Sequence, residues 1–276
     1  MALLFILKFH CMKQHQTVKI QILNDNVAGR WCRSEHGLSF LVEADQTVLF
    51  DTGSSDLIGY NANIMGIDLQ QIKTIVLSHG HDDHTGGLML FSNSKLICHP
   101  DTFLKRFRKS NQTELGIRWP EQEIRQKFDL VTSREPVKIS EQIWFLGEIP
   151  RINDFESRRT AFVKADGTDD FVMDDSGLAI ITSKGLVVVS GCAHSGICNM
   201  ITQAKKVTGI EKVHAVIGGF HLQNDDIVTQ KTIGWMKENG VEQVIPSHCT
   251  ALPAQAAIMQ HYRFLQVKSS NIIEMG

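Results

Sequence analysis

Short apolar runs alternate with longer polar or amphipathic segments along most of the chain. Residues 17–23 alternate polar and apolar side chains and predict a first strand, and residues 37–43 and 47–50 predict a hairpin. Further strands are predicted wherever a short apolar run is bounded by turn residues. These runs are residues 75–77, 95–99, 142–146, 178–182, 186–189, 213–217 and 241–245.

Helices are expected between many of these strands, where apolar residues recur at helical spacing. The predicted helices cover residues 61–71, 86–93, 197–207, 227–239 and 253–261. The strands fall into two sets, each with helices behind it, and no Gly-, Ser- or Pro-rich linker separates the sets. The pattern therefore predicts a single four-layered α/β domain over residues 17–276.

Two segments interrupt this pattern. Residues 101–134 are rich in charge and have helix-like apolar spacing, so we expect an inserted helical cap over a functional site. This segment contains a cationic cluster of four residues, Lys105, Arg106, Arg108 and Lys109. We predict that the cluster forms a solvated helix face; contact with a substrate anion is the alternative. Residues 152–176 are polar and predict a loop across the mouth of the site.

Composition narrows the class of protein. The chain has 276 residues, 42% of them hydrophobic, and a net charge of −2, which argues against binding to nucleic acid or to anionic membranes. Residues 2–7 are too few to span a bilayer and lack the features of a signal peptide, so residues 1–16 are interpreted as an N-terminal extension, with Met12 an alternative start. The six cysteines form no C-x-x-C pair, which favours reduced thiols in the cytoplasm.

The richest chemistry follows the strand at residues 75–77, in the run IVLSHGHDDHTGG. Within it, an H-x-H-x-D-H spacing places His79, His81, Asp83 and His84 on one short loop. Imidazole and carboxylate together suit zinc, iron or manganese. A solvated polar loop is the alternative, but this spacing of donors argues against it.

Four other strands end in similar chemistry. The residues that follow them are Asp51, Cys192 with His194, His221 and His248. Because strand ends at one edge of a sheet converge, we expect two divalent metal ions, with zinc preferred and iron or manganese as alternatives. One ion would take His79, His81 and a later donor, and the other Asp83, His84 and His248. Asp51 is interpreted as a residue that supports the site or as part of a turn.

These motifs carry a resemblance to a known family. EHGLSFLVE, LFDTGSS, LSHGHDDHTGGL, SGCAHSGICN, GGFHL and PSHCT together resemble the metallo-β-lactamase fold superfamily over about residues 17–250. More narrowly they look like the branch of dihydropterin ribofuranosylaminobenzene-phosphate synthase-like proteins. The resemblance implies an αββα sandwich with a metal centre at one edge.

The chain departs from the superfamily pattern at one ligand. Hydrolases of the superfamily carry a histidine well before a Gly-Asp pair, whereas this chain has Gly191-Cys192 there, preceded by Asp174 and Asp175. His194 is the best substitute ligand. Cys192 is either a thiolate ligand or a small buried residue.

Three further residues are predicted around the site. His221 is expected to be a ligand, a partner of a ligand or a catalytic acid that faces the substrate. His36 and Arg151 are weaker candidates for substrate contact.

Three functions follow from this constellation. The first is a metal-dependent hydrolase in which a hydroxide bridging two metal ions attacks an ester, phosphoester or related bond of a small molecule. An anionic substrate is one option. Asp83 would orient or deprotonate that water. The alternative is the pterin-pathway transferase reaction for which the branch is named. A metal-binding protein without turnover is less favoured, because a structural site does not need two adjacent half-sites.

Overall fold

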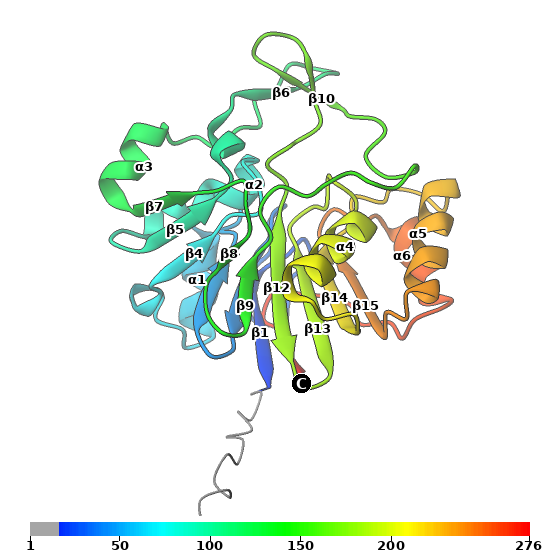
Figure 1. The fold of residues 1–276 in the computed structure, drawn as a ribbon. Coiled ribbons are helices and arrows are strands. Elements are labelled where there is room, and N and C mark those ends of the chain that lie inside the picture. Colours follow the sequence, from blue (N-terminus) through cyan, green and yellow to red (C-terminus); the bar gives the residue numbers. More distant parts are fainter. Residues whose placement is uncertain (1–16) are drawn as a thin grey trace, which may run out of the picture.

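Two β-sheets pack face to face with helices on their outer faces (Figure 1). The computed structural model describes residues 17–276; the proposed N-terminal extension and the alternative start at Met12 lie outside the described residues. The seven-stranded sheet has the order β16 (Ile272–Met275), β1 (Val18–Asn24), β2 (Ser39–Glu43), β3 (Thr47–Phe50), β4 (Thr74–Val76), β5 (Lys95–Cys98) and β7 (Asp129–Thr132). The six-stranded sheet has the order β15 (Gln243–Ser247), β14 (Val213–Gly219), β13 (Gly185–Ser190), β12 (Gly177–Thr182), β9 (Ile143–Phe145) and β8 (Val137–Lys138).

Alternation along the strands builds the layers. Phe40 and Val42 of β2 point into the core between the sheets, whereas Leu41 points to the helices outside. In β13, Val187 and Val188 divide in the same way between the inner core and the core under the helices. Because both faces of the central strands are buried, their sequences read as nearly continuous apolar runs. The predicted αββα sandwich is confirmed.

Each outer face has its own helices. On the seven-stranded sheet these are α1 (Leu57–Ile64) and α3 (Glu121–Lys127), which contribute Ile58 and Ile124 to the same apolar cluster. On the six-stranded sheet they are α4 (Ile197–Thr208), α5 (Ile227–Glu238) and α6 (Leu252–Met259). In Figure 1, α4 lies across β12 and β13.

The strand directions bring the predicted ligands together. The pairs β3–β4, β4–β5, β13–β14 and β14–β15 are parallel, so within each sheet these strands end at a common edge. The contact of His84 Nε2 with Cys192 Sγ at 3.2 Å shows that the two edges meet. Asp51 follows β3, the histidine motif follows β4, Cys192 follows β13 and His248 follows β15. The topology therefore gathers chain segments that are far apart in sequence at one site.

Several local predictions were wrong in detail. The helix expected at residues 61–71 begins earlier, as α1, and stops at Ile64; a short 3₁₀ turn, η1 (Leu69–Gln71), follows. The helix expected at 86–93 is the 3₁₀ segment η2 (Gly86–Leu90) after α2 (Asp82–Thr85). At Gly86 a Cβ would lie 2.0 Å from the Ser54 carbonyl oxygen, so the chain packs backbone to backbone there.

The segment expected to be a helical cap contains one regular α-helix, α3, between the 3₁₀ turn η3 (Pro100–Phe103), β6 (Arg106–Arg108) and β7. The segment expected to be a loop contains β10 (Phe162–Lys164) and β11 (Asp169–Asp170). These two strands and β6 form a third small sheet, and β6 and β10 lie above the sandwich in Figure 1. Pairing between such distant segments leaves no local periodicity that a sequence pattern could reveal.

The cysteines and the lengths of the helices bear on the predicted reduced thiols and on membrane insertion. Cys32, Cys98, Cys192, Cys198 and Cys249 are all free thiols. Among residues 17–276, no helix combines the length and the apolar character that crossing a bilayer requires.

Candidate metal centre

The imidazoles of His79, His81 and His194, three of the predicted ligands, meet in one cluster, which we call the first set. Nε2 of His79 lies 2.9 Å from Nδ1 of His81, and one ring nitrogen from each of His79, His81 and His194 lies within 4.8 Å of the others. Burial lowers the pKa of all three imidazoles well below the usual value, so they are neutral and present lone pairs. Nε2 of His194 is buried without a hydrogen-bond partner. Such a polar atom is costly unless something binds it, and a divalent metal ion fits this donor set.

The second set, which consists of Asp83, His84 and His248, lies beside the first. Asp83 Oδ2 is 3.3 Å from His248 Nε2 and 3.7 Å from His84 Nε2, and His84 Nε2 is 3.2 Å from Cys192 Sγ. Donors around one zinc ion with bonds of about 2.0–2.3 Å lie roughly 3.3–3.7 Å apart. These separations match that requirement, and His248 Nε2 is also buried without a hydrogen-bond partner.

Charge in the second set depends on Asp83. Burial opposes ionisation of this carboxyl group, but the nearby imidazoles of His84, His248 and His36 hold its pKa well below the usual value. Burial alone would lower the pKa of His84, yet Asp83 and Asp51 raise it to about 9. A metal ion that binds His84 must therefore displace a proton at neutral pH.

Asp51 supports the ligands from behind. Its carboxylate accepts hydrogen bonds from the Ser78 N–H and hydroxyl, both at 2.7 Å, and from His84 Nδ1 at 2.7 Å. The bond to Nδ1 leaves Nε2 of His84 facing the other donors, as carboxylates do behind metal-binding histidines. Asp51 is fully buried, and its backbone has a φ of 58°.

Left-handed backbone is concentrated around the site. Ala193, His221 and His248, like Asp51, have φ values near +50° although none is glycine. This conformation costs a non-glycine residue roughly 1 kcal/mol or more. Each of these residues follows a strand end, where the turn directs a side chain or its neighbour into the cluster.

The thiols extend the cluster between the two sets. Cys192 can share an ion with His79 and His84, and it can also share one with His248 and Cys249. The Cys249 thiol also donates to the Cys192 carbonyl oxygen at 3.6 Å. Sequence reasoning missed Cys249; its position directly after His248 at a strand end was the available signal.

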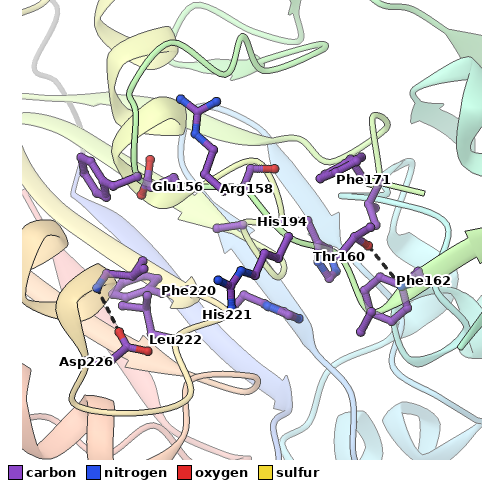
Figure 2. Close-up of a pocket in the computed structure, with 18 of the residues that line it drawn as sticks. Glu156, Arg158, Thr160, Phe162, Phe171, His194, Phe220, His221, Leu222 and Asp226 are labelled. Atoms are coloured by element: carbon purple, nitrogen blue, oxygen red, sulfur yellow. Dashed lines mark hydrogen bonds between the residues drawn. The ribbon is translucent and has the colours of Figure 1, made fainter. Parts of the chain in front are cut away.

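A cavity of about 510 Å³ opens next to the first set (Figure 2). Phe162, Phe171 and Phe220 line it together with Arg158 and Arg159. His194 and His221 also line the cavity, and their ring centroids lie 4.4 Å apart. His221 belongs to none of the metal-binding groups found among residues 17–276, and it lines the cavity instead (Figure 2).

The predicted substrate contacts take different positions. His36 is exposed, and its Nε2 lies 3.2 Å from Asp83 at the rim of the second set. Arg151 instead lies behind the cavity wall, where it donates to the Phe171 and Val172 carbonyl oxygens at 2.9 and 3.0 Å.

The prediction of a solvated helix face was wrong for Arg106. This residue lies in β6 and is fully buried, 2.9 Å from Asp174 and 3.4 Å from Asp170. The pairing of β6 with β10 places Arg106 next to these aspartates, and local sequence does not reveal that pairing.

Comparison with known proteins shows the family and the fold. The model of the metallo-beta-lactamase superfamily matches residues 34–99. The chain is 35% identical to 7,8-dihydropterin-6-methyl-4-(beta-D-ribofuranosyl)-aminobenzene-5'-phosphate synthase of Methanocaldococcus jannaschii, over 93% of this chain and 96% of that protein. It is 32% identical to the uncharacterized protein MJ0448 of the same organism, over 92% and 99% of the two chains.

A solved structure is also similar over nearly the whole chain. It is Tm1679, described as a metal-dependent hydrolase of the beta-lactamase superfamily, with a TM-score of 0.84 and 28% identity. The similarity covers 94% of this chain and 99% of Tm1679. The similarity to this solved structure therefore extends over nearly all of the described chain and is not confined to the histidine motif.

Proposed function

Because this chain belongs to the metallo-β-lactamase superfamily, we propose that it is a hydrolase that uses two divalent metal ions to cleave an ester or phosphoester bond of a small molecule. One observation carries the proposal. Two sets of imidazole, carboxylate and thiol donors, several without hydrogen-bond partners, lie next to each other, and His194 of the first set lines a cavity of about 510 Å³. Nitrogen and sulfur donors together favour zinc, with iron or manganese as alternatives.

Each ion has a donor set within the cluster. His79, His81 and His194 would hold the first ion, and the second would take Asp83, His84 and His248. Cys192 lies between the sets and supports either ion. Metal ions held there would polarise the bond to be broken and lower the pKa of a water molecule toward neutrality.

The remaining groups have roles that depend on their position. Asp83 is ionised and its carboxylate would orient a water molecule or accept its proton. His221 faces the cavity and would donate a hydrogen bond or a proton to the leaving group. Arg158 and Arg159 carry positive charge to the cavity wall, which favours an anionic substrate, and the phenylalanines favour an apolar or aromatic portion.

A second candidate function is a synthase reaction. The observation that favours it is the 35% identity to the M. jannaschii synthase over nearly the whole of both chains. The product in that enzyme's name contains a pterin, an aminobenzene ring and a 5'-phosphate. A cavity lined by phenylalanine and arginine suits those parts as well as it suits a hydrolase substrate.

Metal analysis and a substrate panel test both candidates. Freshly purified protein is assayed for zinc, iron and manganese, and then with bis-p-nitrophenyl phosphate, p-nitrophenyl phosphorylcholine, lactones and thioesters. A parallel assay offers a dihydropterin donor with β-D-ribofuranosyl-aminobenzene 5'-phosphate. Hydrolysis of the panel supports the first candidate, and product formation only in the parallel assay supports the second.

Two variants connect activity to the site. His84→Ala is expected to lose one ion and at least about 100-fold in kcat, because it removes a ligand. His221→Ala should keep both ions and lower kcat about 10²–10⁴-fold, the usual contribution of general acid catalysis. His261→Ala changes an exposed histidine away from the site and serves as the control. Less than one ion per chain in the wild type, or full activity of His84→Ala, would contradict the proposal.

A further inference from the structure

Two neighbouring aspartates contact the loops that carry the first ligand set. Asp174 Oδ2 accepts the N–H of Gly80 at 2.7 Å, and Gly80 stands between His79 and His81. Asp175 Oδ2 accepts the N–H of Ser195 at 3.0 Å and its hydroxyl at 2.5 Å. Ser195 directly follows His194, so each aspartate holds one side of the same cluster.

The contacts leave the histidine loop little freedom. Ser176, which follows Asp175, donates its N–H to the Ser78 carbonyl oxygen at 2.9 Å, so Asp174 and Ser176 hold the two ends of the turn before His81. On the opposite side, a Cβ at Gly80 would lie 2.0 Å from the Thr102 carbonyl oxygen. Gly80 is therefore fixed between the Asp174 carboxylate and the Thr102 backbone.

The small third sheet compensates the burial of one of these carboxylates, that of Asp174. Both aspartates are fully buried, and Arg106 from β6 reaches Asp174 Oδ1 at 2.9 Å. Oδ1 of Asp175 has no hydrogen-bond partner. Well-packed apolar residues are often at least as stabilising as buried charges, so stability alone does not account for this arrangement.

We infer that Asp174 and Asp175 are positioning residues that set the geometry of His79, His81 and His194 on a shared metal ion. The inference rests on the proposed metal centre. Asp174 acts on the loop between two of the ligands, and Asp175 acts on the residue next to the third. Partners behind metal ligands typically change metal affinity 10- to 100-fold when they are removed.

Cobalt titration of metal-free protein tests the inference. Co²⁺ is added in the presence of a competing chelator, the visible absorption of the bound ion is followed, and the Tm of the metal-free protein is measured separately. Asp175→Ala should weaken the first ion about 10- to 100-fold and change its spectrum, while the second ion keeps its affinity. Asp175→Asn should stay close to wild type, because its amide oxygen can accept both bonds from Ser195. Asp169→Ala, an exposed aspartate of β11, is the control.

The outcomes separate the two proposals. If the wild type fails to bind two cobalt ions, the proposed metal centre is wrong and the inference falls with it. If the wild type binds both but Asp175→Ala shows only a lower Tm, with unchanged affinity and spectrum, the aspartate is merely structural and the inference alone is wrong. Should Asp175→Ala not fold, Ser195→Ala decides: it removes only the hydroxyl bond, and a several-fold weaker first ion supports positioning, whereas unchanged binding overturns it.

Discussion

Gly191, which directly follows β13, is packed so closely that a single methyl group should disturb the metal centre. A Cβ at this position would lie 2.1 Å from Ser78 Oγ, 2.5 Å from Ser78 Cβ and 3.0 Å from Asp51 Oδ2. The first distance is about 1.3 Å shorter than the 3.4 Å at which ordinary contact begins. Ser78 and Asp51 are fully buried and bonded to each other at 2.7 Å, so neither can move alone.

Gly191→Ala should therefore affect stability and metal binding together. Overpacking of this kind costs about 1–3 kcal/mol, which in a domain of this size lowers Tm by roughly 2–4 °C per kcal/mol. Because Asp51 also holds Nδ1 of His84, its displacement should weaken the second ion about 10- to 100-fold. Denaturant unfolding of the metal-free protein measures the first effect, and cobalt titration against a chelator measures the second.

Gly234→Ala provides the matched control. Gly234 lies within α5, and a Cβ there would meet nothing within 4 Å. Alanine should stabilise this helix by up to about 1 kcal/mol and leave metal binding unchanged. If Gly191→Ala unfolds at the wild-type denaturant concentration and binds cobalt with wild-type affinity, the close contact does not constrain the site and the reasoning is refuted.

Two further substitutions test the groups around the site. Asp51→Asn replaces an acceptor oxygen near His84 Nδ1 with a donor, so the second ion should bind about 10- to 100-fold more weakly in the cobalt titration. Unchanged affinity would show that Asp51 does not support the metal ligands. Asp25→Asn tests a buried carboxyl group whose pKa burial raises to about 7 from an unfolded value of 3.8. Below pH 3.8 Asp25 is protonated in the folded and the unfolded chain alike, and its contribution to stability is lost as pH rises from there through about 7, because the unfolded chain ionises first. The variant should therefore gain stability over wild type with rising pH, by on the order of 2–4 kcal/mol at pH 8. A difference between the two unfolding free energies that does not change with pH would contradict this.

Much of the candidate site was accessible from sequence because its ligands follow buried strands. His79, His81, Asp83 and His84 come from one loop whose spacing is already diagnostic. His248 could be added because parallel strands end at a common edge, a rule that depends on periodicity and not on particular contacts. The order of strands and helices predicted a four-layered α/β domain, and the resemblance to the metallo-β-lactamase superfamily implied the αββα sandwich.

Other features depended on contacts between distant segments. Arg106 looked like an exposed charge, and only its place in β6 beside β10 shows it buried against Asp174. Arg151 looked like a substrate ligand, yet its hydrogen bonds hold the Phe171 and Val172 backbone behind the cavity. The chemistry of an isolated side chain does not distinguish these roles, because burial and partners are properties of the packed chain.

The sequence by itself determined the layered fold and the type of metal chemistry. Both follow from local periodicity and from the spacing of donor residues, which every strand carries with it. Only the tertiary structure decided that His194 joins His79 and His81, that Cys249 lies next to Cys192, and that Asp174 and Asp175 contact the ligand loops. These relations depend on the angles at which turns leave the strands, and on which distant segments pair above the sheet edge.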